Sequence, residues 1–247
     1  MVRAETAGGV ARIALDRPEK KNAFTAQMYR QLADALAAAD AAADVRAVLL
    51  HGTRDCFSAG NDLADFLKPR APGEEPATAG LFRALPGMKK PVVAAVAGPA
   101  IGIGCTLLLH CDLVYAAPNA RFQLPFVALG IVPEFGSTLL LPRLAGYQRA
   151  AELFLLGEPF SADQAREAGI VNAVVPAAEV LELAERKARA LAALPPESIR
   201  LTKALLKATQ RGALEARIAE ESRIFAERLD SPEARAAMNA FLEKRKG

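Results

Sequence analysis

Glu134 is the residue of this 247-residue chain best suited to acid–base chemistry, because it is the only charged residue between Arg121 and Arg143. Its neighbours in the segment IVPEFGS are apolar or small. Burial among apolar groups disfavours the charged form of a carboxylate and raises its pKa towards the range useful for a general base. A competing interpretation is a first-turn helix residue, since the helix dipole favours Glu at that place.

Two glycine-containing loops offer backbone N–H groups that could bind an anion. The segment GPAIGIG, from Gly98 to Gly104, follows an apolar stretch and precedes a helical pattern, so its N–H groups are expected at a helix N-terminus. The segment CFSAGNDL, from Cys56 to Leu63, again lets the backbone approach a ligand closely. Both also have purely structural interpretations, which are close helix–strand packing for the first and an Asx turn for the second.

Other kinds of site are disfavoured by residue spacing. The GxxxGxG pattern also occurs in short-chain dehydrogenases, but their Tyr-x-x-x-Lys pair is absent, because no lysine lies four residues after Tyr115 or Tyr147. Cys105, His110 and Cys111 share a short stretch without the usual spacing of zinc ligands. We therefore expect neither a nicotinamide cofactor nor a metal.

The composition is that of a globular protein with a sizeable core, at 52% hydrophobic and 24% charged residues. A net charge of only +3, spread along the chain, argues against a nucleic-acid partner. Three cysteines without a C-x-x-C pair, and no apolar leader, favour a cytoplasmic location. The uncharged run between Lys90 and Asp112 could span a bilayer by length, but glycines and Pro99 interrupt it, so no membrane span is expected.

The elements that must position these residues alternate along the chain. Apolar strands are expected at residues 10–15, 45–50, 92–98, 113–116 and 171–175, with helices at residues 26–43, after Thr25 as a possible cap, and 103–109. Such alternation predicts an α/β fold with largely buried strands. The stretch KPRAPGEEPATAG after Leu67 lacks an apolar face, which favours a mobile surface loop or lid edge.

The C-terminal part has a helical pattern almost throughout. Helices are expected at residues 176–193, 196–211, 213–229 and 232–244, the last after Ser231 as a cap. We accordingly divide the chain into an α/β core, residues 1–190, and a helical region, residues 191–247. Helical periodicity does not decide whether these amphipathic helices complete their own core or contact another subunit.

Several segments, in this order, resemble the crotonase family, the enoyl-CoA hydratase and isomerase superfamily. They are LDRPEKKNAF (15–24), FSAGNDL (57–63), AVAGPAIGIG (95–104), CDLVYAAPNARF (111–122), LGIVPEFGS (129–137) and AREAGIVNAVV (165–175). The resemblance implies a crotonase-like spiral of ββα units, a C-terminal helical trimerisation region and acyl-CoA thioester substrates without a separate cofactor. It also implies a homotrimer or a dimer of trimers, with the tail around Phe241 and Lys244 near a neighbouring subunit's CoA.

The resemblance also implies the site residues. The backbone N–H groups of Asn61 and Ile103 would hold the thioester oxygen, since an enolate needs preorganised donors. Contacts to the adenine, pantetheine and phosphate parts of CoA would fall on Ala23, Ala59, Gly60, Leu63, and Lys20 or Lys21.

Two positions depart from the hydratase pattern. Thr106 and Phe126 stand where hydratases carry their two catalytic glutamates. Glu134 instead lies where peroxisomal-type and related bacterial 3-enoyl to 2-enoyl-CoA isomerases have a single catalytic carboxylate. The resemblance therefore implies an enoyl-CoA delta isomerase of fatty acid β-oxidation. The alternatives are hydration or other crotonase-like chemistry, including ring isomerisation of aromatic-derived CoA thioesters, and non-catalytic acyl-CoA binding.

Overall fold

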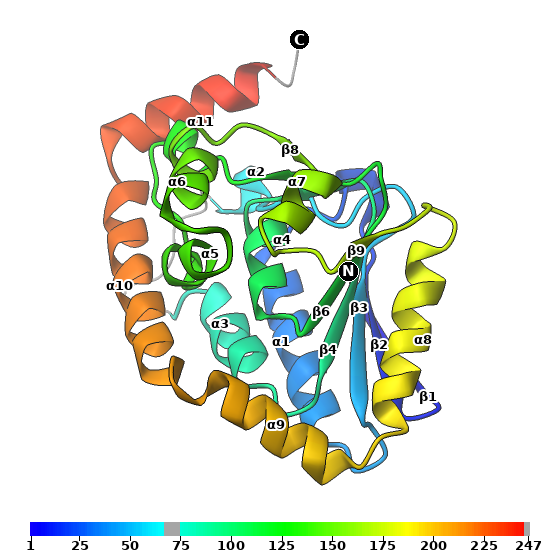
Figure 1. Ribbon diagram of the computed structural model, residues 1–247. Helices are drawn as coiled ribbons and strands as arrows, with labels where there is room; N and C mark the ends of the chain where they lie inside the picture. The colour runs from blue at the N-terminus through cyan, green and yellow to red at the C-terminus, as the bar shows by residue number, and fades with distance from the viewer. Residues whose placement is uncertain (67–74, 245–247) are drawn as a thin grey trace.

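A computed structural model describes residues 1–66 and 75–244, and its strands form two sheets (Figure 1). The larger sheet contains β1 (Val2–Ala7), β2 (Val10–Leu15), β3 (Ala47–His51), β4 (Val92–Val96), β6 (Leu113–Ala116) and β9 (Ala173–Val174), in that order. The smaller sheet has the order β5 (Pro99–Ile101), β7 (Arg121–Gln123) and β8 (Phe160–Ser161). In the larger sheet β1 pairs with β2 antiparallel, whereas the pairs β2–β3, β3–β4, β4–β6 and β6–β9 are parallel.

The chain repeatedly visits both sheets before it enters a helix. β4 belongs to the larger sheet, and β5 of the smaller sheet follows after a turn at Gly98 and leads into α4 (Ile103–Thr106). In the same way β6 is followed by β7, and then by the 3-10 helix η3 (Val127–Leu129) and by α5 (Ser137–Ala145). This succession of two strands and a helix confirms the predicted spiral of ββα units.

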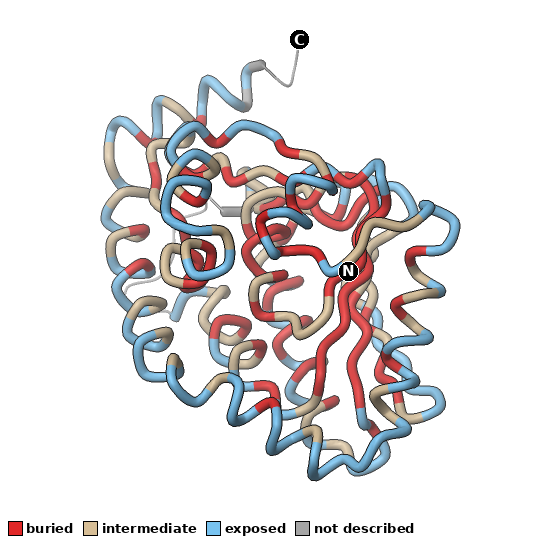
Figure 2. Tube along the Cα trace, in the orientation of Figure 1, coloured by how far each residue is buried: buried red, intermediate tan, exposed pale blue. Residues whose placement is uncertain are grey.

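Helices cover both faces of the larger sheet. α8 (Val180–Ala192) packs on one face, where Val180, Ala184 and Ala188 join a buried cluster with residues of β3 and β4. The opposite face is covered by α1 (Ala26–Ala41) and α3 (Thr78–Gly87), as Figure 1 shows. The strands between these layers are buried along most of their length (Figure 2), as their apolar sequences predict.

Most expected helices are confirmed, and the N-terminal caps explain where two of them begin. The side chain of Thr25 accepts a hydrogen bond from the N–H of Met28 at 3.2 Å, which caps α1. Ser231 similarly accepts from Ala234 at 3.1 Å, at the start of α11 (Pro232–Lys244). Further helices are α2 (Leu63–Phe66), α6 (Tyr147–Leu155), α7 (Ala162–Glu167), α9 (Pro196–Ala208) and α10 (Arg211–Leu229), with a short 3-10 helix η1 (Pro18–Lys20).

Three local expectations differ from the structure. The helix expected at residues 103–109 is α4 followed by a tighter 3-10 turn, η2 (Leu107–His110). β1 gives no apolar pattern because, except for Val2, its residues are exposed and it is held by backbone pairing with β2. The segment expected as a loop after Leu67 lies partly outside the described residues, and its end, from Thr78, is the first turn of α3, which buries Leu81 and Leu85.

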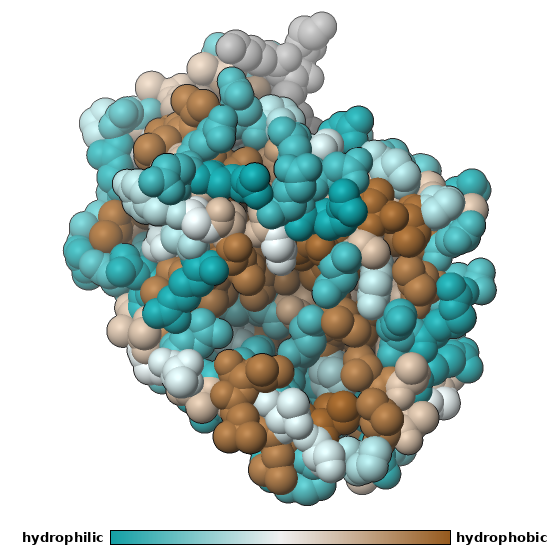
Figure 3. Space-filling model, viewed as in Figure 1, coloured by the Kyte–Doolittle hydropathy of each residue, from teal (hydrophilic) through white to brown (hydrophobic). Residues whose placement is uncertain are grey.

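The C-terminal helices surround the core and complete it. In Figure 1, α9, α10 and α11 follow its periphery in turn, and Phe225, Ala234 and Met238 are buried in the main hydrophobic cluster. α9 is anchored by the Lys203 ammonium, which contacts a carboxylate oxygen of Asp112 at 2.6 Å. Figure 3 nevertheless shows apolar surface along the lower edge of the molecule, where α9 runs. Its exposed side chains include Leu201, Leu205 and Leu206. Among the described helices, none combines the length and hydropathy needed to cross a bilayer.

The turn at Gly98, where the chain leaves one sheet for the other, yields a stability prediction. Gly98 has a φ of 63°, and a Cβ atom there would lie 1.9 Å from the carbonyl oxygen of Asp55. We expect Gly98→Ala to lower the free energy of unfolding by at least about 2 kcal/mol. In Gly212→Ala, on α10, the new Cβ meets no atom within 4 Å, so this variant should be stabilised by about 0.5–1 kcal/mol. Urea unfolding measures the free energy of unfolding of both variants. An equal change in the two would contradict the special role of the turn at Gly98.

Candidate active site

Two loops that are distant in sequence are joined by backbone hydrogen bonds. The N–H of Phe24 donates to the carbonyl of Gly60 at 2.8 Å, and the N–H of Ala59 donates to that of Lys21 at 2.9 Å. The N–H of Asp62 donates back to the carbonyl of Phe24 at 2.9 Å. The predicted CoA contacts on these two loops therefore lie side by side.

Asn22 fixes the first of these loops from inside the protein. It is fully buried and has a φ of 53°. Its Nδ2 donates to the carbonyls of Cys56 and Phe57 at 2.9 and 3.1 Å, and its Oδ1 accepts from the N–H of Arg17 at 2.7 Å. The role of Asn22 could not be predicted from the sequence, because nothing in a charged turn distinguishes a buried asparagine from an exposed one.

The glycine loop before α4 packs directly against the second of these loops. The N–H of Ser58 donates to the carbonyl of Pro99 at 2.8 Å, and the N–H of Ile101 donates to that of Ser58 at 2.9 Å. A Cβ atom on Gly60 would lie only 2.9 Å from the carbonyl oxygen of Ile101. Glycine is needed for this approach, which brings the loops of Asn61 and Ile103 together.

Asn61 and Ile103 both leave a backbone N–H available. Within the part of the chain that the structure describes, neither N–H donates a hydrogen bond. Ile103 is the first residue of α4 and follows Gly102, whose φ of 55° turns the chain into the helix. Asn61 lies between Gly60 and Asp62, whose backbone groups pair with Phe24. Two N–H groups without a partner are what the predicted oxyanion hole requires.

A mainly apolar cavity of about 460 Å³ lies next to these loops. Its lining comes from α1, α2, the segment before α3, α3 itself, the turn before α5, and α10. It includes Phe24, Tyr29, Phe82, Glu134, Ile218, Ser222, Phe225 and Leu229. Asn61, Ile103 and the other predicted CoA contacts do not line it. The structure therefore brings Glu134 into the cavity and places the predicted oxyanion donors on the loops beside it.

Glu134 is buried in the cavity wall, with 3% of its surface exposed. Its Oε1 has no hydrogen-bond partner among the described residues. Burial, together with the charge of nearby Glu221, raises the pKa of Glu134 to about 8. The alternative interpretation as a first-turn helix residue is wrong, because α5 begins only at Ser137 with Gly136 as its N-cap. A carboxyl group in this state can accept or donate a proton near neutral pH.

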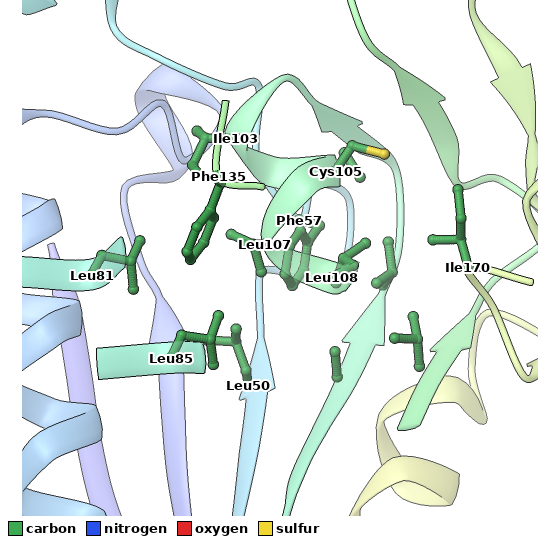
Figure 4. Close-up of a cluster of buried hydrophobic side chains, with 14 of the residues drawn as sticks. Leu50, Phe57, Leu81, Leu85, Ile103, Cys105, Leu107, Leu108, Phe135 and Ile170 are labelled. Carbon is green, nitrogen blue, oxygen red and sulfur yellow. The ribbon is translucent and has the colours of Figure 1, made fainter. Parts of the chain in front are cut away.

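The turn that carries Glu134 has an unusual backbone. Phe135 has a φ of 65° and Gly136 a φ of 69°, and the positive φ is costly for a phenylalanine. The Phe135 ring stacks on Phe82 with centroids 4.2 Å apart, and Nε2–H of His110 donates to the Phe135 carbonyl at 2.8 Å. Burial lowers the pKa of His110 to about 3, so its ring is neutral. Figure 4 shows Phe135 pointing into the buried cluster that also contains Ile103.

Two residues that the sequence analysis missed connect these parts. Tyr29, on α1, lines the cavity and donates from its hydroxyl to Oδ1 of Asn61 at 2.6 Å. Burial and the charge of Glu134 both raise the pKa of Tyr29, so the phenol stays protonated. Glu221, on α10, is buried and accepts from the N–H of Gly136 at 2.5 Å. Their helical patterns show only where each helix is buried, not which polar group reaches across the cavity.

The two positions that depart from the hydratase pattern are also buried. The hydroxyl of Thr106 has no hydrogen-bond partner among the described residues, and Phe126 belongs to the main hydrophobic cluster. Neither side chain can exchange a proton with a substrate in the way that a carboxylate does.

A spiral of ββα units with a buried carboxyl group and two available N–H donors defines the class of crotonase-like proteins, and the comparisons with known proteins give the family. The sequence pattern described as "Enoyl-CoA hydratase/isomerase" matches residues 5–247. The chain therefore belongs to the enoyl-CoA hydratase/isomerase family of enzymes. The crystal structure of an enoyl-CoA hydratase/isomerase from Pseudoalteromonas atlantica superimposes with a TM-score of 0.95 at 38% identity, covering 98% of this chain and 97% of that one.

Curated relatives carry both hydratase and isomerase names. The 2,3-dehydroadipyl-CoA hydratase of Escherichia coli is 36% identical over 234 residues, which are 94% of this chain and 92% of that protein. The 1,2-epoxyphenylacetyl-CoA isomerase of the same organism is 36% identical over 244 residues, 96% of this chain and 93% of that protein. Enoyl-CoA delta isomerase 2 of Rattus norvegicus is 35% identical over 96% of this chain and 62% of its own length.

The buried state of Glu134 predicts a pH-dependent stability difference. The pKa of Glu134 is raised on folding, so its ionisation destabilises the fold as the pH rises from about 4.3, the ordinary value, to about 8. Glu134→Gln cannot ionise, so its melting temperature should exceed that of the wild type by a margin that grows across this range to several degrees. Thermal unfolding at pH 5, 7 and 9 measures this margin, with exposed Glu215→Gln as the control. A margin independent of pH would contradict the burial of a titrating Glu134.

Proposed function

We propose that this protein is an enoyl-CoA delta isomerase, which moves the double bond of a 3-enoyl-CoA to position 2. The observation that carries the proposal is that Glu134 differs from the other described carboxyl groups of the cavity in both its burial and its hydrogen bonding. Of the described carboxyl groups that line the cavity, Asp65 accepts from the N–H of Ala26 at 2.7 Å, and exposed Glu75 pairs with Arg83. Glu134 alone among them is buried with a partnerless oxygen.

One carboxyl group suffices for this isomerisation. The Glu134 carboxylate removes the proton α to the thioester, and the electron pair of the broken C–H bond delocalises onto the thioester oxygen. The N–H groups of Asn61 and Ile103 stabilise this dienolate oxygen. Glu134 then returns the proton to the γ carbon as the double bond forms between C2 and C3. Atoms and electrons balance without an oxidant, a metal or a separate cofactor.

Hydration makes a different demand on the site. A family hydratase uses two carboxyl groups to hold and to split water, whereas Thr106 and Phe126 stand at those positions here. These features favour isomerisation over hydration. The second candidate is ring isomerisation of an aromatic-derived CoA thioester, because one of the relatives is named 1,2-epoxyphenylacetyl-CoA isomerase.

The CoA part of the substrate would lie along the joined loops. Ala23, Ala59, Gly60 and Leu63 would contact adenine and pantetheine, and exposed Lys21 would contact a phosphate. Support comes from the hydrogen bond between Ala59 and the Lys21 carbonyl, which places both loops on one strip. The thioester would then enter between this strip and the glycine loop.

We extend the proposal to assembly and location. Exposed leucines on α9, 48–75% accessible, support a homotrimer or a dimer of trimers, which light scattering would measure. The tail around Phe241 and Lys244 would lie near a neighbouring subunit's CoA. Cys56, Cys105 and Cys111 are all unpaired, which supports the cytoplasm as a reducing compartment for β-oxidation chemistry.

Removal of the Glu134 charge tests the proposed reaction. Glu134→Gln keeps the volume of the side chain but cannot accept the α proton, so isomerisation of a 3-enoyl-CoA should fall by about 10²-fold or more. Affinity for the CoA ester should change by less than about threefold, since the proposed binding contacts to CoA lie on the joined loops and not at Glu134. For the wild type, kcat/KM should rise with pH to a plateau, with its inflection near 8, because the free base is the active form.

Several results would overturn this proposal. Retention of more than about a third of the rate by folded Glu134→Gln would exclude Glu134 as the base. Faster turnover of a 2-enoyl-CoA in the presence of water would favour a hydratase, and turnover of an epoxide of phenylacetyl-CoA would favour ring isomerisation. Binding of acyl-CoA esters without turnover of any of them would favour a non-catalytic role.

A proline at position 103 tests the proposed oxyanion hole. Proline is well tolerated as the first residue of a helix, but it lacks the N–H group. We expect Ile103→Pro to remain folded and to lose about 10²–10³-fold in kcat, as other enzymes do when one donor is removed. Ile103→Val keeps the N–H and a similar shape, so it should retain most of the activity. Equal rates for the two folded variants would show that this donor is not used.

A further inference from the structure

Glu221 is a buried carboxylate that the proposed reaction does not use. It lies on α10, with 4% of its surface exposed, and reaches the start of α5. Its Oε2 accepts from the N–H of Gly136 at 2.5 Å. Its Oε1 accepts from the N–H of Thr138 at 3.0 Å and from the Thr138 hydroxyl at 2.5 Å. Both carboxylate oxygens are thus occupied by donors from one turn.

These contacts explain how α5 begins without a cap of its own. Its N-cap residue is Gly136, which has no side chain to accept from the first N–H groups of the helix. Glu221 supplies that acceptor from another helix, where the dipole of α5 also favours a negative charge. A carboxylate accepts at both of its oxygens, whereas an amide accepts at only one.

The same contacts fix the turn that carries Glu134. Gly136 lies two residues after Glu134, and a left-handed Phe135 stands between them. The ring and the carbonyl of Phe135 are held by Phe82 and His110, while Glu221 holds the N–H of Gly136. Glu134 itself makes no contact that fixes Oε1. Its direction into the cavity therefore depends on what holds the next two residues.

We propose that Glu221 is a positioning residue, which anchors the Glu134 turn from α10 and acts on Glu134 electrostatically as a second buried carboxyl group. This inference rests on the proposed function only in naming isomerisation as the reaction affected. It makes α10, a helix of the C-terminal region, part of the acid–base apparatus, because α10 both lines the cavity and supplies the anchor.

The charges around the two carboxyl groups support this electrostatic role. Burial is the larger cause of the raised pKa of Glu134, and Glu221 is the second. The Tyr29 hydroxyl, on α1, lines the same cavity as Glu134 and is neutral. Burial raises the pKa of Glu221 itself, whereas its hydrogen bonds from Thr138 and Gly136 favour the charged form, as does Arg217 on the same helix, which pairs with exposed Glu220. Neutralising Glu221 should therefore lower the pKa of Glu134.

Glu221→Gln and Glu220→Gln form a matched pair on adjacent positions of α10. Glu221→Gln removes the buried charge and presents an amide N–H₂ to one of the donors of the turn. We expect the plateau value of kcat to fall about tenfold or more, with KM changed less than about threefold. The inflection of the pH–rate profile should move towards acid by at least about 0.5 unit. Exposed Glu220→Gln should leave kcat, KM and the inflection unchanged.

A direct titration separates this inference from the proposed reaction. Carboxyl-carbon NMR of protein labelled with ¹³C-glutamate follows Glu134, whose signal is assigned by its absence in Glu134→Gln. The titration of this signal should also shift towards acid in Glu221→Gln, whichever acyl-CoA the enzyme converts. If the NMR shift occurs but 3-enoyl-CoA is not isomerised, the proposed function fails and the inference stands. An unshifted titration overturns the inference.

Thr138→Val tests the anchor if Glu221→Gln does not fold. This variant loses the hydroxyl that donates to Glu221 but retains both carboxylates. We expect kcat to fall by about threefold or more, because one hydrogen bond of the anchor is lost, while the titration of Glu134 does not move towards acid. An unchanged kcat would overturn the role of these contacts in positioning Glu134.

Discussion

The structure depends on one constraint, which is that a carboxyl group must stay in an apolar cavity and still face a fixed direction. Burial raises the pKa of Glu134 to about 8, where the carboxyl group can both accept and donate a proton near neutral pH. Burial also removes the solvent that would otherwise stabilise the charge. The backbone compensates with a left-handed turn at Phe135 and Gly136. That turn is held by aromatic packing on one side and by α10 on the other.

The fold provides the second half of the site through close contact of three loops. The chain passes from one sheet to the other at Gly98, and this brings the glycine loop against Ser58 and Gly60. A side chain at Gly60 would collide with the backbone of the glycine loop. Among the described residues, the N–H of Ile103, the first residue of α4, has no hydrogen-bond partner, and neither has that of Asn61. Tyr29 connects this region to the cavity of Glu134. The proposed acid–base group and the proposed anion site thus come from separate elements of one spiral.

Much of this arrangement could be predicted, for physical reasons that particular residues illustrate. A lone charge among apolar residues predicted that Glu134 is buried, and Thr25 before an apolar stripe predicted the start of α1. β1 was not predicted, because it is held by backbone pairing with β2 and shows no apolar pattern. The role of Glu221 was not predicted, because its partners include backbone N–H groups far away in sequence, which leave no pattern on α10. The division at residue 190, the site roles and the oligomer stay predictions.

Isotope transfer tests the central claim, that one buried carboxyl group carries the proton from the α to the γ carbon. The substrate is a 3-enoyl-CoA deuterated at the α carbon, and the product of a single turnover in ordinary water is examined by mass spectrometry and NMR. Because Glu134 is 3% exposed, its proton should exchange with solvent slowly, and a substantial part of the deuterium should appear at the γ carbon. Complete loss of the label to water, with a solvent proton at the γ carbon in every product molecule, would contradict transfer by a single shielded base.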